Sequence, residues 1–124
     1  MTLRPISGSR PWHTQYAPGV RTDFEPQATT WTAVMSAAFD RYAENVLIEY
    51  YGESYSFADV RAAAARVAAA LRAHGIEKGD RVALHLPNCP WHPIFFFGTL
   101  AAGAVVTHLS PLDAEQESAH KLHD

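Results

Sequence analysis

Cysteine is almost absent from this sequence: Cys89 is the only one among 124 residues. A single cysteine cannot form a disulfide within the chain, which excludes a small secreted fold held together by disulfides. The N-terminus, Met-Thr-Leu-Arg-Pro-Ile, also lacks the apolar run of a secretory signal peptide. We therefore expect a cytoplasmic location.

Long apolar runs and an excess of positive charge are missing as well. The most apolar stretch, residues 94–102, is about half of the roughly 20 residues that cross a bilayer, so no transmembrane segment is predicted. Ten Lys and Arg against thirteen Asp and Glu give a net charge of -3. This balance disfavours a nucleic-acid partner, which requires a basic surface.

The glycine-rich loops that cradle phosphates are absent too. Neither G-x-G-x-x-G nor G-x-x-x-x-G-K-[ST] occurs, and no serine lies in a G-x-S-x-G elbow. A nicotinamide or flavin domain is therefore disfavoured.

The composition that remains is that of a folded protein. Hydrophobic residues make up 48% and charged residues 19% of the chain, which excludes a disordered tail, a coiled coil and collagen. A chain of this length forms about one small domain, which excludes a complete large enzyme with several domains.

Residues 1–28 are predicted to form an irregular, proline-rich lead-in. Four prolines interrupt any regular pattern: Pro5, Pro11, Pro18 and Pro26. Trp12, Tyr16 and Phe24 make the segment more apolar than a free linker, so we expect these rings to pack onto a surface of the protein.

An amphipathic helix is expected over residues 30–42, followed by two short strands. The apolar residues of the helix recur at helical spacing, which is typical of a face in the core: Trp31, Val34, Met35, Ala38, Phe39 and Tyr42. The strands, residues 46–51 and 54–55, are expected to be joined by a tight turn at Gly52-Glu53.

A second helix is predicted to begin at Phe57. Ser56 and Asp59 have the spacing of a capping box, and the alanine-rich run that follows favours helix. Gly75 is expected to end this helix in the left-handed conformation. Three arginines are expected on its solvent side: Arg61, Arg66 and Arg72.

The next part alternates strand, helix and strand. Residues 81–86 and 104–109 are predicted strands, and the second is apolar enough to be buried on both faces, as in parallel sheets. We expect the helix between them to be capped by Asn88, to carry Pro90 in its first turn and to end at Gly103.

A second capping box, Asp113 with Gln116, predicts a polar helix that runs to Asp124. The alternation of elements is typical of the α/β class, and residues 29–124 are expected to form a partial parallel sheet flanked by helices. No strand follows the last helix, so the sheet would keep an unpaired edge. We therefore expect the chain to be one part of a larger fold.

The histidines and the cysteine are weak candidates for chemistry. Glu117, His120 and His123 do not share one helix face, which argues against a metal site. The strand histidines, His85 and His108, are more typical of structural positions than of a general base. Cys89 and His92 lie about one helical turn apart, but an inert thiol is the simpler interpretation. We assign no catalytic, cofactor-binding or metal-binding residue.

Several short motifs, in this order and at these spacings, resemble the N-terminal portion of adenylate-forming (AMP-binding) enzymes. That superfamily contains acyl-CoA synthetases, luciferases and the adenylation domains of peptide synthetases. The motifs are Tyr55-Ser56-Phe57-Ala58-Asp59-Val60, His74-Gly75-Ile76, Lys78-Gly79-Asp80-Arg81-Val82-Ala83, Leu86-Pro87-Asn88, Leu100-Ala101-Ala102-Gly103-Ala104-Val105-Val106 and Ser110-Pro111. The resemblance covers roughly residues 30–124.

The resemblance implies an acyl-CoA ligase that joins a carboxylic acid to AMP and then to the thiol of coenzyme A. ATP, Mg and CoA are expected for such a parent enzyme, but none is expected to be bound by this segment, because the family's Pro-Lys-Gly loop, acidic motifs and C-terminal lysine belong further along the chain. The segment alone is thus expected to be inactive, with the remainder of the enzyme as its partner.

The resemblance leaves the acid open. The family often has an acidic residue where this chain has Trp91-His92-Pro93, and Asn where it has Ser110. A fatty or dicarboxylic acid is expected rather than an aryl acid or an amino acid, and the resemblance is to the medium- or long-chain fatty acid type. The alternative function is a non-catalytic α/β interaction module that stands alone and self-associates through its sheet edge.

Overall fold

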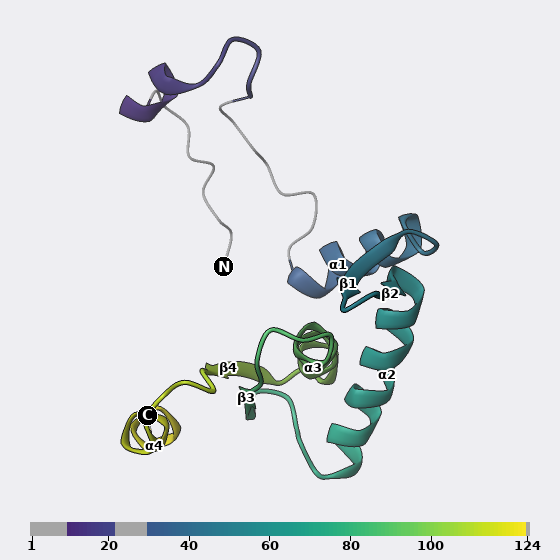
Figure 1. The fold of residues 1–124 in the computed structure, drawn as a ribbon, viewed down its shortest axis with the longest axis vertical. Coiled ribbons are helices and arrows are strands. Elements are labelled where there is room, and N and C mark those ends of the chain that lie inside the picture. The colour runs from purple at the N-terminus through teal and green to yellow at the C-terminus, as the bar shows by residue number, and fades with distance from the viewer. Residues whose placement is uncertain (1–9, 22–29, 124) are drawn as a thin grey trace.

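A computed structural model of the chain describes residues 10–21 and 30–123, and its elements alternate between helix and strand (Figure 1). In chain order they are the 3₁₀ helix η1 (Pro11–Gln15), α1 (Trp31–Arg41), β1 (Val46–Tyr50), β2 (Glu53–Ser56), α2 (Phe57–Ala73), β3 (Arg81–His85), α3 (Trp91–Ala102), β4 (Val105–Leu109) and α4 (Glu115–His123). The predicted α/β class is confirmed.

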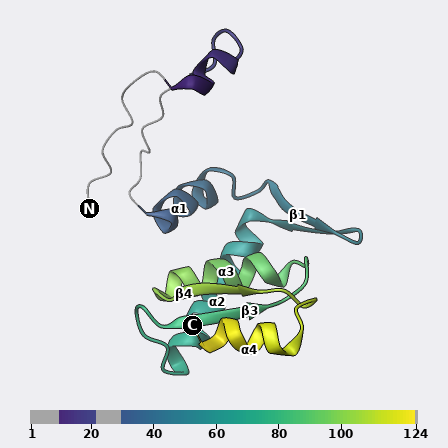
Figure 2. The same cartoon turned by 90° about the vertical axis from the view of Figure 1, so that its left-hand side faces the viewer.

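The centre of the fold is a β3–α3–β4 unit with parallel strands. The register runs from Arg81 opposite Val105 to His85 opposite Leu109. This small sheet lies between α3 and α4, and α2 packs on the far side of α3 (Figures 1 and 2). Gly103 has a φ of +89° at the end of α3, as predicted, because the chain must turn sharply from helix into β4.

β1 and β2 form an antiparallel hairpin, as expected, but the turn lies one residue earlier than predicted. Tyr51 and Gly52 occupy it with φ values of +47° and +86°, and Glu53 pairs with Tyr50. The tight two-residue turn that suits the twist of a hairpin requires positive φ at both central positions. Glu53 therefore belongs to the strand.

The predicted capping box of α2 is confirmed. The Asp59 N–H donates to Ser56 Oγ at 3.1 Å, and the Ser56 N–H donates to Asp59 Oδ2 at 2.9 Å. The Ser56 hydroxyl also donates to Asp59 Oδ2 at 2.6 Å, and this bond, followed by that from the Ser56 N–H, lowers the pKa of Asp59. Gly75 follows the helix with a φ of +86°, also as predicted.

Helices α2 and α3 pack closely because small residues line their contact. Gly98 of α3 is buried against Val67 and the Ala64 carbonyl of α2, and a Cβ at Gly98 would lie 2.6 Å from the Val67 side chain. Beside this contact, Val60, Ala63, Ile94 and Phe39 form a buried cluster that joins α1 to both helices.

The expectation that the apolar stripe of residues 31–42 lies in the core is confirmed for Phe39 and for Met35, which packs beside it, but is wrong for both ends of the stripe. Phe39 is 7% exposed, but Trp31 is 55% exposed, and Val34 and Tyr42 are exposed as well. Phe39 is the position at which α1 meets α2 and α3. Within the described residues, no element covers the start of the stripe.

Three further predictions are corrected by the structure. β4 is not buried on both faces, because Val105 is 48% exposed and only Leu109 of this strand is buried. Asn88 does not cap α3: the helix begins at Trp91, so Pro90 occupies the cap position and Asn88 precedes it by two residues. Asp113 does not form a capping box with Gln116, because α4 begins at Glu115 and the Asp113 carboxylate binds elsewhere.

The described part of the lead-in contains η1, which its prolines did not predict. Trp12 and Tyr16 are 54% and 45% exposed, so the structure does not show these rings packed onto the protein. Their ring contacts are with His13, between them. Phe24 lies outside the described residues.

Candidate functional site

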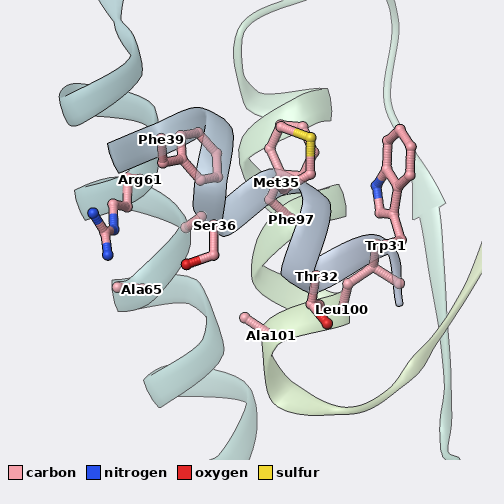
Figure 3. A pocket seen from close by; sticks show the side chains of 11 residues that line it. Trp31, Thr32, Met35, Ser36, Phe39, Arg61, Ala65, Phe97, Leu100 and Ala101 are labelled. Carbon is pink, nitrogen blue, oxygen red and sulfur yellow. The ribbon is translucent and has the colours of Figure 1, made fainter. Parts of the chain in front are cut away.

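An apolar groove of about 220 Å³ opens between α1, α2 and α3, and we call it the α1 groove (Figure 3). Its walls carry few polar groups. The lining residues are Trp31, Thr32, Met35, Ser36, Phe39, Arg61, Ala64, Ala65, Phe97, Leu100 and Ala101. Phe39 forms part of the wall and also packs edge-to-face on Phe97, with ring centroids 5.5 Å apart.

The one charged group on the wall of the α1 groove is already paired. Arg61 Nη1 lies 2.5 Å from Asp40 Oδ1, and both side chains are more than half exposed. A solvent-exposed pair of this kind contributes little to stability. Because its partner neutralises it, Arg61 leaves the groove suited to an apolar group.

A second cluster lies where the parallel strands end, which is the edge at which open α/β sheets usually bind ligands. His85 Nε2 lies 3.2 Å from the Ser110 carbonyl oxygen, and the Ser110 N–H donates to Asp113 Oδ2 at 3.0 Å. Lys121 Nζ donates to the same oxygen at 2.7 Å and lies 2.9 Å from Glu117 Oε1. The charged groups of this cluster are thus paired with one another, and their contacts hold α4 against the end of β4.

These contacts shift the pKa values of both partners. The hydrogen bond from Lys121, followed by that from the Ser110 N–H, lowers the pKa of Asp113 below its ordinary 3.8. The hydrogen bonds to Asp113 and then to Glu117 raise the pKa of Lys121 above its ordinary 10.5. The ionised Asp113 carboxylate therefore stabilises the folded state at pH values above 3.8, its ordinary pKa. This stabilisation is lost as the pH falls through the lower pKa of the folded state. The protonated Lys121 amine stabilises the folded state at pH values below 10.5, its ordinary pKa. This stabilisation is lost as the pH rises through the higher pKa of the folded state.

We expect Asp113→Asn to loosen α4 at neutral pH. The amide cannot pair with the Lys121 charge, so the α4 amides should exchange with solvent faster than in the parent chain, as measured by hydrogen exchange. The variant should also lose the acid-dependent loosening that the parent shows below about pH 4. Glu115→Gln, an exposed carboxylate of the same helix, is the matched control. Equal α4 protection in the Asp113 variant and the parent would contradict this assignment.

The structure brings together two histidines that lie far apart in sequence. The rings of His92 and His108 stack with centroids 5.1 Å apart, and His108 also stacks on Phe96 at 5.7 Å. The contact between His92 and Cys89 is a backbone hydrogen bond of 3.0 Å from the His92 N–H to the Cys89 carbonyl. No sequence signal marked the histidine pair, because one member begins a helix and the other lies on a strand.

In residues 10–21 and 30–123, no three or more His, Cys, Asp or Glu side chains are grouped so that they could hold a metal ion. Glu117 of the C-terminal trio instead pairs with Lys121. None of the helices in the same residues has the length and apolar character needed to cross a bilayer.

The arrangement of helices and strands matches that of solved adenylation domains. The N-terminal subdomain of Klebsiella oxytoca NpsA, in complex with 3-hydroxyanthranilyl-AMSN, superposes with a TM-score of 0.73 at 19% identity, covering 75% of this chain and 24% of that one. The O-succinylbenzoate coenzyme A synthetase MenE of Bacillus subtilis gives 0.69 at 24% identity, covering 73% and 24%. The chain therefore has the fold of part of each of these two proteins.

The sequence assigns the family. The family model described as AMP-binding enzyme matches residues 35–124, and the chain belongs to this family. The resemblance drawn from the motifs is thus confirmed.

Two groups of curated relatives match different lengths of the chain. A long-chain-fatty-acid–CoA ligase of Bacillus subtilis is 32% identical over 119 residues, which are 96% of this chain and 21% of that protein. The 4-coumarate–CoA ligase 3 of Oryza sativa is 42% identical over 72 residues, which are 58% of this chain and 12% of that protein. The chain spans about a fifth of the length of the relatives that it matches over most of its own length.

Proposed function

We propose that this chain is the N-terminal α/β portion of an ATP-dependent acyl-CoA ligase. Such an enzyme converts a carboxylic acid, ATP and CoA into acyl-CoA, AMP and pyrophosphate. The observation that carries the proposal is the 32% identity to a long-chain-fatty-acid–CoA ligase over 96% of this chain. A cytoplasmic location belongs to the same proposal.

The described residues do not fit a Mg-ATP site of their own. Magnesium in such sites is held by carboxylates together with the phosphates of the substrate. Asp40 is paired with Arg61, Asp59 caps α2, and Asp113 accepts hydrogen bonds from Ser110 and Lys121. Because these carboxylates already have partners within the chain, we propose that the reacting groups belong to the remainder of the ligase.

The role that we propose for this chain is structural. The β3–α3–β4 unit supplies two parallel strands, and α2 covers the outer side of α3 (Figure 1). Exposed apolar residues such as Val105 on β4 and Leu122 on α4 would be covered by the rest of the enzyme.

We propose a fatty acid as the substrate. The match to the fatty-acid ligase extends over almost the whole chain, whereas the match to the 4-coumarate ligase covers little more than half of it.

The test is a chimera in which this chain replaces the matching fifth of the Bacillus subtilis ligase. We expect ATP–pyrophosphate exchange in the presence of a long-chain fatty acid, the acid of the host ligase. The chain alone, as the control, should give no exchange above the blank. Exchange by the chain alone would contradict its structural role. A folded, soluble chimera without exchange would contradict its place in a ligase.

The alternative is an interaction module that self-associates. Within the described residues each sheet has two strands, β1 with β2 and β3 with β4, so each leaves strand edges unpaired. We expect the chain alone to self-associate at micromolar concentration, as measured by sedimentation velocity. A single defined oligomer would favour the module, and indefinite aggregation would favour a ligase portion deprived of its partner. A clean monomer would contradict the expectation.

A further inference from the structure

The parallel sheet of β3 and β4 leaves two strand edges unpaired, because within the described residues it has only these two strands. A free edge presents N–H and C=O groups that can pair with a further strand. We propose that the edge of β3, rather than that of β4, accepts the next parallel strand of the sheet, and that the part of the ligase to which α4 connects supplies this strand. The inference rests on the proposed function, because it requires the remainder of a ligase.

The connection through α3 fixes the relative positions of the two strands. β3 and β4 are parallel neighbours, and α3, which joins them, lies on one face of their sheet (Figure 1). Connections of this kind are right-handed in about 98% of cases. Seen from the side of α3, with the strands pointing upward, β4 therefore lies to the right of β3.

Helix α4 follows β4 on the opposite face, because the sheet lies between α3 and α4 (Figures 1 and 2). A right-handed connection that uses the opposite face crosses the sheet in the opposite direction. The strand reached through α4 must then lie on the β3 side of β4. Because β3 already occupies the position next to β4, the nearest free position is the outer edge of β3.

The placement of α4 agrees with this direction. In both views α4 lies beyond β3 rather than beyond β4 (Figures 1 and 2). The segment before α4 is held at the carboxyl end of the strands, where His85 Nε2 lies 3.2 Å from the Ser110 carbonyl oxygen. From there α4 runs back along the sheet (Figure 2). A strand that follows α4 would thus begin near the amino end of β3, where a parallel partner of β3 has to begin.

The backbone of β3 offers the groups that such a strand needs. The Val105 N–H donates to the Asp80 carbonyl at 2.7 Å. Successive residues of a strand pair alternately toward its two sides, so the N–H and C=O of Ala83, three residues after Asp80, point away from β4. Ala83 is exposed. Because α3 and α4 lie on the two faces of the sheet, we expect the incoming strand to be apolar on both faces.

The test compares the chain alone with the Bacillus subtilis chimera described above, by hydrogen exchange resolved to single amides. In the chain alone, at sub-micromolar concentration, the Ala83 amide should exchange as an unprotected edge amide. In the chimera its exchange should be slower by about 100-fold or more, because the added strand accepts its hydrogen bond. The Leu84 amide, which points toward β4 by the same alternation, should be protected in both and is the internal reference.

A proline variant tests the same edge through stability. Ala83→Pro removes an N–H of the outer edge and leaves the bonds between β3 and β4 in place. It should lower the urea midpoint of the chimera more than that of the chain alone, as followed by tryptophan fluorescence. Ala83→Ser, which keeps the N–H, is the matched control and should not show this difference.

Two results would overturn the inference. An Ala83 amide that exchanges equally fast in the chain alone and in a chimera with ATP–pyrophosphate exchange would do so, and it would leave the proposed function standing. Protection that appears at Val106, on the outer edge of β4, and not at Ala83 would assign the added strand to the other edge. If the chimera does not fold, the same amides are read after the chain is mixed with the remaining part of the Bacillus subtilis ligase, made as a separate polypeptide.

Discussion

Phe39→Ala is expected to lower the free energy of unfolding by about 3–5 kcal/mol, which is the usual cost of truncating a buried phenylalanine. Phe39 is 7% exposed and packs edge-to-face on Phe57, with centroids 6.1 Å apart, and on Phe97 at 5.5 Å. One side chain thus joins α1 to the first turn of α2 and to the middle of α3. Urea denaturation followed by circular dichroism measures the change.

Val34→Ala is the matched control, because Val34 lies on the same helix and is exposed. Its effect should stay within about 0.5 kcal/mol. A Phe39 variant as stable as the Val34 variant would mean that the contact of α1 with α2 and α3 does not form in solution.

Gly98→Ala is expected to cost about 1–3 kcal/mol although alanine is the better helix former, because the added methyl overfills the contact between α2 and α3. The new Cβ would lie 2.6 Å from Val67 Cβ and 2.9 Å from the Ala64 carbonyl oxygen. The helix axes must separate to admit it, since neither a β-branched side chain nor a backbone carbonyl can rotate away. The midpoint of urea unfolding measures the loss.

The control for Gly98 is the same substitution in a Val67→Ala background. Part of the steric conflict is then removed, so Gly98→Ala should cost less there than in the parent chain. The Cβ of residue 67 and the Ala64 carbonyl remain, so the rescue should be incomplete. Equal costs in the two backgrounds would show that the γ-methyl groups of Val67 do not press on position 98.

Features governed by local hydrogen bonds were predictable from the sequence. The start of α2 at Ser56 and Asp59, its end before Gly75 and the end of α3 at Gly103 all depend on groups within a few residues. The hairpin turn was misplaced by one residue because Gly52 marks a position of positive φ but does not say which neighbour shares it.

Features that depend on contacts between distant segments were not predictable. Asp113 and Gln116 have the spacing of a capping box, but Asp113 is drawn to Lys121 and to the Ser110 N–H instead. The stripe of residues 31–42 shows that α1 is amphipathic without showing how much of it is covered. The α1 groove and the stacked His92 and His108 exist only where separate elements meet.

The sequence by itself determined the order of helices and strands, most of their ends and the resemblance to the adenylate-forming enzymes. These properties follow from short-range backbone chemistry and from motifs read along the chain. The tertiary structure alone decided which apolar faces are buried, because burial depends on which elements pack against one another. It likewise decided that Asp40 pairs with Arg61 and that Asp113 pairs with Lys121, because each pair joins residues of different elements.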